Sequence, residues 1–174
     1  MKKLFLTLAL AFISTTMIVS ADNKPLIYNL TTTDNNKITV EDTKEGLNFK
    51  EFKGKAVLLV LFGHRCPPCI AEIPSFIELT NKHPNDLAIV AIESQNYPVD
   101  EVKAFQKEHK MNYNIVAGVN HNDFITYIAG RAGYSNGIPL PLLIAIDKNG
   151  EVQNVHPGRL RLDELEILVK DLNE

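Results

Sequence analysis

The sequence predicts an α/β domain in which a buried β-sheet carries helices on both faces. Three short apolar runs point to the sheet, at residues 56–62, 87–92 and 141–146; none of them contains a charged residue or alternates between apolar and polar. Such runs are typical of strands that are buried on both faces. Amphipathic segments lie between them, and strands that alternate with helices favour an α/β architecture.

The segment before the first apolar run predicts a short β-hairpin. Residues 26–31 and 37–40 are strand candidates on either side of the turn cluster Asp34-Asn35-Asn36. Polar residues 42–46 follow as a loop. Residues 47–52 then predict one helical turn, and Gly54 marks the approach to the buried strand at 56–62.

Helices are predicted where apolar residues recur at helical spacing. They are expected after Cys69 to about Lys82, over residues 99–109, around residues 124–128 and over residues 162–172. Two shorter strands complete the expected sheet, at residues 113–116 and 151–155. The second of these returns from the tight hairpin turn Asp147–Gly150.

Composition and charge exclude several classes of protein. The chain has 174 residues, of which 45% are hydrophobic and 22% charged, an ordinary composition for one globular domain. The formal net charge is −3, with 18 basic and 21 acidic residues. Because no dense basic face is available, we expect no binding to nucleic acid. Two cysteines in the whole chain exclude a disulfide-dense scaffold.

The first 21 residues have the pattern of a signal peptide. Lys2 and Lys3 precede an uncharged run at 4–19, and Val19-Ser20-Ala21 supplies small residues for cleavage. We therefore expect a signal peptide at 1–21, a domain at 22–174, and a periplasmic or otherwise exported protein. The alternative is an uncleaved N-terminal membrane anchor, although the apolar run is short against the roughly 20 residues of a span. Export permits disulfides.

The predicted chemistry lies in the segment Cys66-Pro67-Pro68-Cys69, which follows a buried strand and opens a helix. Pro67 is suited to the first position of a helix, where its missing N–H would be unpaired anyway. Cys66 would face the free N–H groups of the helix N-terminus, which stabilise a thiolate and leave this sulfur the more exposed. Cys69 would lie one turn inside. This asymmetry predicts that Cys66 attacks and Cys69 resolves.

Other uses of the same spacing fit less well. A zinc site needs further ligands, and the chain has no second cysteine pair. A covalent haem site needs histidine directly after the second cysteine, where Ile70 stands. A structural disulfide across so small a loop constrains the unfolded chain little. Redox chemistry is therefore favoured, with metal binding and an inert disulfide as alternatives.

These residues resemble the thioredoxin superfamily and, more narrowly, the exported TlpA/ResA/CcmG-type thiol–disulfide oxidoreductases. The resemblance covers the chain from about Pro25 to its end. It implies a thioredoxin-like fold with a central mixed β-sheet flanked by helices and an added N-terminal β-hairpin. Four features carry it: the strand–Cys66-Pro67-Pro68-Cys69 junction, Glu72 with Pro74, Pro141 at the opening of a strand, and the hairpin at Asp147–Gly150.

Glu72 and Pro74 match the family pattern C-x-x-C-x-x-E-x-P. Glu72 lies three residues after Cys69, so a helix places both on the same face. A carboxylate beside a thiol pair disfavours thiolate and can shuttle protons; the alternative is a solvated charge on the helix. Pro74 matches the proline that bends the active-site helix, because it removes one helical hydrogen bond.

Pro141 matches the family's cis-proline, which faces the disulfide. The competing position is Pro139, two residues earlier. With Pro141 as the cis-proline, Leu140 would present its backbone to an extended substrate chain, which would pair with this edge beside Cys66.

Some positions depart from the family pattern. The usual tryptophans are replaced by Phe62 and Arg65, and the buried acid of thioredoxin by Val60. Proton handling would then fall to Glu72, water or another group. His64 would add positive charge beside Cys66 and favour the thiolate; the alternative is a solvent-exposed loop histidine.

The resemblance implies an exported disulfide reductase. Its substrates would be exported proteins with cysteines or disulfides, including the haem-site cysteines of apocytochrome c, and its electrons would come from a membrane thiol-transfer protein. We expect a monomer that needs no cofactor and no metal. One alternative is a disulfide-forming oxidase, although the DsbA type carries a histidine where Pro68 stands and a large helical insertion. A copper metallochaperone is the other, although that function in related folds favours a wider cysteine spacing and a distant histidine, and nothing in the sequence ties His121 or His156 to the cysteine pair.

Overall fold

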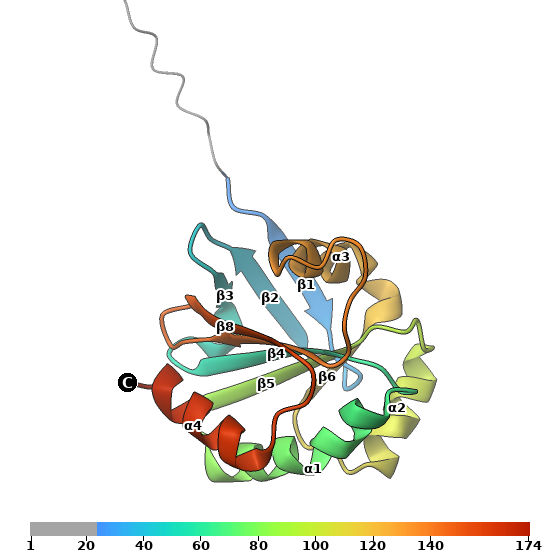
Figure 1. Ribbon diagram of the computed structural model, residues 1–174. Helices are drawn as coiled ribbons and strands as arrows, with labels where there is room; N and C mark the ends of the chain where they lie inside the picture. Colours follow the sequence, from blue (N-terminus) through green and yellow to red (C-terminus); the bar gives the residue numbers. More distant parts are fainter. Residues whose placement is uncertain (1–23) are drawn as a thin grey trace, which may run out of the picture.

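The computed structural model describes residues 24–174, and its elements alternate as the sequence predicts (Figure 1). The predicted signal peptide at 1–21 lies outside the described residues. In chain order the elements are β1 (Ile27–Thr31), β2 (Lys37–Asp42), β3 (Leu47–Phe49), η1 (Lys50–Phe52), β4 (Ala56–Phe62), α1 (Pro67–Lys82), β5 (Leu87–Glu93), α2 (Val99–Glu108), β6 (Asn114–Ala117), η2 (Gly118–Asn120), α3 (Asn122–Arg131), β7 (Leu142–Ile146), β8 (Val152–Pro157) and α4 (Leu162–Leu172).

The central sheet is mixed and has the strand order β6-β5-β4-β7-β8. Strands β4, β5 and β6 are parallel, whereas β7 and β8 run antiparallel to their neighbours. Strand β4 lies in the middle, and all seven of its residues are buried. The prediction of buried strands at 56–62, 87–92 and 141–146 is confirmed to within one residue at each end.

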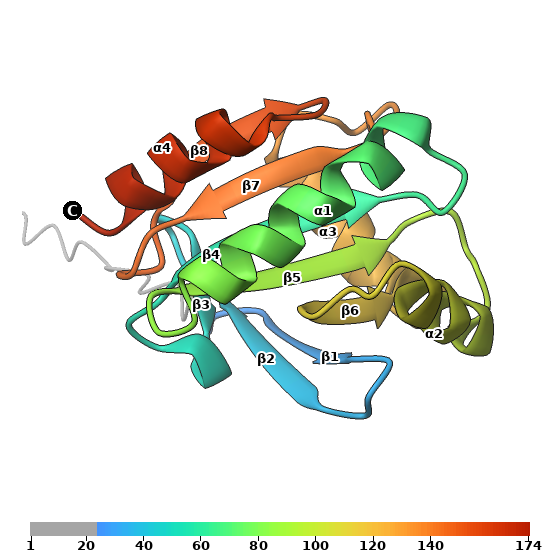
Figure 2. The same ribbon diagram turned by 90° about the horizontal axis from the view of Figure 1, so that it is seen from below.

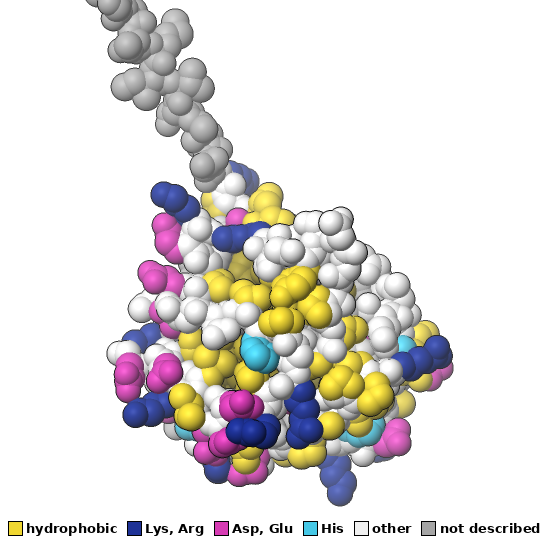
Figure 3. All heavy atoms as spheres, in the orientation of Figure 1, with side chains coloured by type: hydrophobic (Ala, Val, Ile, Leu, Met, Phe, Trp, Pro, Cys, Tyr) yellow, Lys and Arg dark blue, Asp and Glu magenta, His cyan; other side chains and the backbone are white. Residues whose placement is uncertain are grey.

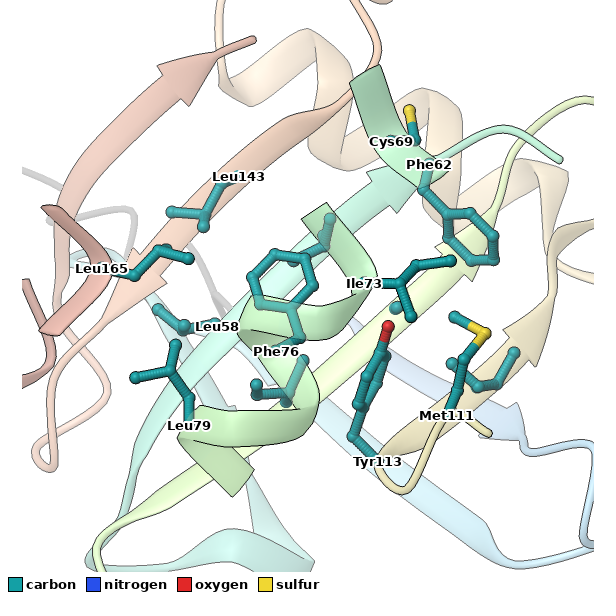
Figure 4. Packing of buried hydrophobic residues seen from close by; sticks show 14 of the residues in the cluster. Leu58, Phe62, Cys69, Ile73, Phe76, Leu79, Met111, Tyr113, Leu143 and Leu165 are labelled. Carbon is teal, nitrogen blue, oxygen red and sulfur yellow. The ribbon is translucent and has the colours of Figure 1, made fainter. Parts of the chain in front are cut away.

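Each face of the central sheet has its own hydrophobic core. Leu58 and Val60 of β4 point into the core beneath α1, α2 and α4, whereas Leu59 and Leu61 point into the core shared with α3 and the N-terminal strands. Figures 1 and 2 show α1 and α4 on one face of the sheet. Figure 4 shows the first core, with Leu58 packed near Leu79 and Phe76. The prediction of helices on both faces is confirmed.

The predicted N-terminal hairpin is confirmed as β1 and β2, and β3 extends it to a three-stranded antiparallel sheet. The prediction of one helical turn over residues 47–52 is wrong for its first half: Leu47–Phe49 is a strand, and only Lys50–Phe52 forms a 3-10 turn. Leu47 and Phe49 are buried on either side of exposed Asn48, and Phe49 pairs with Val40 of β2. The alternation of buried and exposed residues is that of a strand, and pairing with β2 stabilises the strand over a helical turn.

Arg131 at the end of α3 attaches this N-terminal sheet to the rest of the molecule. Its guanidinium forms an ion pair with Asp42 and donates hydrogen bonds to the carbonyl oxygens of Thr43 and Gly46, at 3.2 and 3.4 Å. These contacts bridge segments that are more than 80 residues apart in the chain. The guanidinium thus satisfies three acceptors at once.

We expect Arg131→Gln to lower the free energy of unfolding by about 1–2 kcal/mol, because hydrogen bonds to charged groups are worth more than neutral ones. Denaturant unfolding measures the change. Arg161→Gln is the matched control: Arg161 is 69% exposed and pairs with nearby acids of its own helix, so we expect a change within about 0.5 kcal/mol. Equal effects of the two substitutions would contradict the role of Arg131.

None of the helices within residues 24–174 combines the length and the apolar character that a membrane crossing requires.

Candidate active site

The cysteine pair lies at the junction of β4 and α1. After Phe62 the chain makes a turn in which the N–H of Cys66 donates to the carbonyl oxygen of Gly63, at 3.2 Å. Cys66 is the N-cap of α1, and its sulfur accepts the N–H of Cys69 at 3.3 Å. Cys66 and Cys69 form a disulfide, with their Cα atoms 5.2 Å apart. The predicted position of Cys66 at the helix N-terminus is confirmed.

The disulfide is more covered than the sequence suggests. Cys66 is 7% exposed and Cys69 4%, so the expected difference in exposure is small in the oxidised protein. Both sulfurs pack in the core beneath α1. Pro67 and Pro68 open the helix, and Pro74 lies inside it. Little of either cysteine is therefore exposed to solvent in the oxidised protein.

Glu72 is a buried acid, and the alternative of a solvated helix charge is wrong. Its side chain faces the core with only 1% of the residue exposed. Oε1 accepts the N–H of Leu160, in the loop after β8, at 2.8 Å. Burial raises the pKa of Glu72 from 4.5 to about 7; the Leu160 hydrogen bond and the charge of Arg159 lower it by less. A carboxyl of this kind takes up and releases protons near neutral pH.

A small cavity of about 10 Å³ joins Glu72 to the inner cysteine. Its lining includes Cys69, Glu72, Val60, Tyr113 and Pro141. This volume is about enough for one water molecule. Figure 4 shows the Tyr113 hydroxyl directed toward α1 near Ile73, and burial followed by the charge of Glu72 raises the pKa of this phenol. Val60 is apolar, so Glu72 is the one carboxyl that lines this cavity.

Pro141 lies where the resemblance predicts. The Leu140–Pro141 peptide bond is cis, as expected, and no other peptide bond among residues 24–174 is cis. The bond before Pro139, the competing position, is therefore trans. The carbonyl oxygen of Pro141 accepts the N–H of Gly158 at 2.8 Å, which fixes the loop against the end of β8. Leu140 packs against the core that contains both cysteines. The loop is therefore held next to the disulfide.

A second buried acid, Glu93, escaped the sequence analysis. It is 0% exposed at the end of β5, and its Oε1 lies 2.8 Å from Nδ1 of His64. The His64 side chain is 10% exposed, so the alternative of a solvent-exposed loop histidine is wrong. One signal was available: Glu93 follows the apolar run at 87–92 directly, and a charge that continues a buried strand needs a partner.

Within the described part of the chain, no three histidine, cysteine or acidic side chains come together as metal ligands would. Neither His121 nor His156 lines the cavity beside Cys69. The residues that surround the disulfide are instead a carboxyl, a phenol and apolar side chains. This arrangement is suited to moving electrons and protons through the two sulfurs.

Comparison with known proteins gives one family and one group of relatives. The Redoxin family profile matches residues 29–171. The thiol–disulfide oxidoreductase ResA of Halalkalibacterium halodurans is 30% identical over 115 residues. That match covers 66% of this chain and spans 60% of the length of ResA.

Solved structures share the fold at lower identity. A thiol:disulfide interchange protein of the thioredoxin family from Chlorobium tepidum superposes with a TM-score of 0.67 at 22% identity, covering 88% of this chain and all of that one. A secreted Mycobacterium tuberculosis disulfide oxidoreductase, described as homologous to E. coli DsbE, superposes with a TM-score of 0.62 at 18% identity. That match covers 83% of this chain and 95% of the other. These likenesses establish the thioredoxin-like fold.

Proposed function

This chain belongs to the Redoxin family and carries the cysteine pair of a thiol–disulfide oxidoreductase, and we propose that it works as a disulfide reductase on exported proteins. The observation that carries this proposal is the asymmetric placement of the disulfide. Cys66 is the N-cap of α1, whereas Cys69 lines a cavity that also holds a buried carboxyl. One sulfur thus meets the partner, and the other meets the proton-handling group.

The proposed exchange uses both sulfurs in order. The reduced enzyme attacks a substrate disulfide with the Cys66 thiolate, which forms a mixed disulfide and releases one substrate thiolate. The Cys69 thiol loses its proton and attacks the sulfur of Cys66, which releases the second substrate thiolate. Two electrons pass to the substrate, and the enzyme is left with the Cys66–Cys69 disulfide that the structure contains. A donor dithiol then restores the reduced pair.

Glu72 is the proposed proton acceptor for Cys69. The two residues line one cavity, and a water molecule there would connect them. Since the pKa of Glu72 is raised to about 7, the carboxyl accepts the Cys69 proton and passes it on near neutral pH. Three prolines shape the helix around this path: Pro67 and Pro68 are the first two residues of α1, and Pro74 lies inside the helix, about two turns from its start.

Leu140 and Pro141 form the proposed substrate-binding edge. The loop is held beside the disulfide, and its backbone offers a place for an extended segment to pair. On the face seen in Figure 3, hydrophobic side chains gather across the middle, while charged side chains lie mostly toward the left and lower margins. Haem-site cysteines of apocytochromes c are the substrate class that we propose for test.

The proposed location is outside the cytoplasm. The signal-peptide pattern at 1–21, with the mature domain at 22–174, supports it, as does the secreted relative from Mycobacterium tuberculosis. A membrane thiol-transfer protein is the proposed electron donor. N-terminal sequencing of the protein recovered from cells tests this part: a chain that begins at residue 22 supports a cleaved signal, and one that begins at Met1 supports an anchor.

The reduction potential tests the direction of the reaction. We expect equilibration with glutathione to give about −200 mV or below for the Cys66–Cys69 pair, the range of reducing dithiols. A value near about −120 mV is typical of a strong oxidant and would assign the protein to disulfide formation instead. Mass spectrometry of the alkylated protein gives the reduced fraction at each glutathione ratio.

A further inference from the structure

The loop between α3 and β7, residues 132–141, has an exposed tip that makes few contacts with the rest of the molecule (Figure 1). Tyr134 and Ile138 pack against the core shared with the N-terminal strands. Residues 135–137 between them are exposed. From 135 to 140, no backbone N–H donates a hydrogen bond to a backbone carbonyl within residues 24–174. The tip is thus a short exposed segment between two anchored side chains.

Asn136-Gly137 lies in this tip, and asparagine followed by glycine is a pair that rearranges without a catalyst. The chain contains this pair twice, at Asn136-Gly137 and at Asn149-Gly150. In the rearrangement, the backbone nitrogen of the glycine attacks the side-chain carbonyl carbon of the asparagine. Glycine favours the attack because it has no Cβ to hinder the approach and because its backbone rotates freely. The structure decides which of the two pairs can react.

The two pairs differ in how the attacking nitrogen is held. The Gly150 N–H donates to the carbonyl oxygen of Asp147 at 3.0 Å, and the Asn149 N–H donates to the Asp147 carboxylate at 2.9 Å. A Cβ at Gly150 would lie 2.2 Å from Oδ1 of Asn48, so this glycine is also closely packed. A Cβ at Gly137 would meet nothing within 4 Å. Both asparagines are exposed, so exposure does not distinguish the two pairs.

We propose that Asn136 is a site of spontaneous modification, at which the side-chain amide is lost through attack by the Gly137 nitrogen, whereas the turn at Asn149 protects the second pair. A bond forms between the Gly137 nitrogen and Cγ of Asn136, and the bond from Cγ to Nδ2 breaks. Ammonia leaves and carries away the hydrogen of the glycine N–H. Water then opens the cyclic imide at either carbonyl carbon, which gives aspartate or isoaspartate. No electrons are transferred, and water is the co-reactant.

The modification changes the loop that leads into Leu140 and Pro141. Both products carry a new carboxylate, and isoaspartate also lengthens the main chain by one carbon. Because Tyr134 and Ile138 are packed on either side, the tip between them must take up the added length. A negative charge therefore appears a few residues before the proposed substrate-binding edge. Its formation does not depend on the proposed function.

The test is peptide mass spectrometry of the purified oxidised protein after ageing in mildly alkaline buffer. Both asparagine–glycine peptides are followed in one sample, so Asn149 is the internal control. Because opening the Asn149 turn breaks at least one hydrogen bond, we expect amide loss to be about tenfold faster at Asn136. In a denaturant that unfolds the chain, the two rates should approach each other. Equal rates in the folded protein, or an unchanged ratio after unfolding, would overturn the proposal.

Asn136→Gln provides a second measurement, because the longer side chain must close a larger ring and cyclises far more slowly. Ion-exchange chromatography of the aged wild type should resolve a more acidic species, which Asn136→Gln should not form. Asn149→Gln is the matched control and should still form it, and thermal melting checks that both variants are folded. An acidic species that persists in Asn136→Gln and disappears in Asn149→Gln would contradict the assignment. The cysteine pair takes no part in this chemistry, so the reduction potential tests the proposed reductase activity separately.

Discussion

Cys69→Ser is expected to trap the enzyme on its substrates, whereas Cys66→Ser traps nothing. Without Cys69 the mixed disulfide at Cys66 cannot be resolved from within the chain, because the sequence has no third cysteine. Both variants should lose turnover down to the rate of the uncatalysed thiol reaction. Non-reducing electrophoresis and mass spectrometry of the adducts measure the trapping. Alkylation of the reduced wild type at mildly acidic pH should label Cys66 first.

The serine variants also control for each other. Each removes the disulfide, so a difference between them reflects the chemistry of the two positions instead of the loss of a cross-link. Cys66 is the helix N-cap, and Cys69 faces the cavity with Glu72. Adducts that accumulate on Cys69 in Cys66→Ser, with none in Cys69→Ser, would reverse the assignment of attacking and resolving sulfur.

The elements that the sequence predicted well are those set by local pattern. Residues 56–62 form a strand with the predicted bounds, because seven apolar residues in the centre of a sheet leave no competing structure. The segment Leu47–Phe49 was missed, since three residues are too few to show a period and only pairing with β2 makes them a strand. A prediction made from these three residues alone does not include the partner strand β2.

The same division applies to the site. Cys66, Cys69 and Glu72 lie within seven residues, and helical geometry alone brings them together. Glu93 contacts His64 across 29 residues, and Leu160 binds Glu72 across 88. No spacing rule along one chain indicates such contacts. They follow from the parallel pairing of β4 with β5 and from the return of the chain after β8.

Glu72→Gln is expected to remove a pH dependence of stability that the wild type shows. The folded protein holds the Glu72 proton more tightly than the unfolded chain, because burial raises the pKa from 4.5 to about 7. Stability from this group is therefore fully present below pH 4.5, falls as the pH rises to about 7, and stays level above it. The loss amounts to about 3 kcal/mol, at 1.36 kcal/mol per pKa unit.

Glutamine has no proton to lose and can still accept the Leu160 N–H, so the buried charge is removed without losing that hydrogen bond. We therefore expect oxidised Glu72→Gln to gain up to about 3 kcal/mol relative to wild type between pH 4.5 and 8, as measured by denaturant unfolding. Its exchange rate should be lower and lack the inflection near pH 7. Glu78→Gln, on the exposed side of α1, is the control and should follow the wild-type curve. A Glu72→Gln curve parallel to wild type would show that this carboxyl does not titrate in the folded protein at neutral pH, and it would leave proton transfer from Cys69 to water in the cavity.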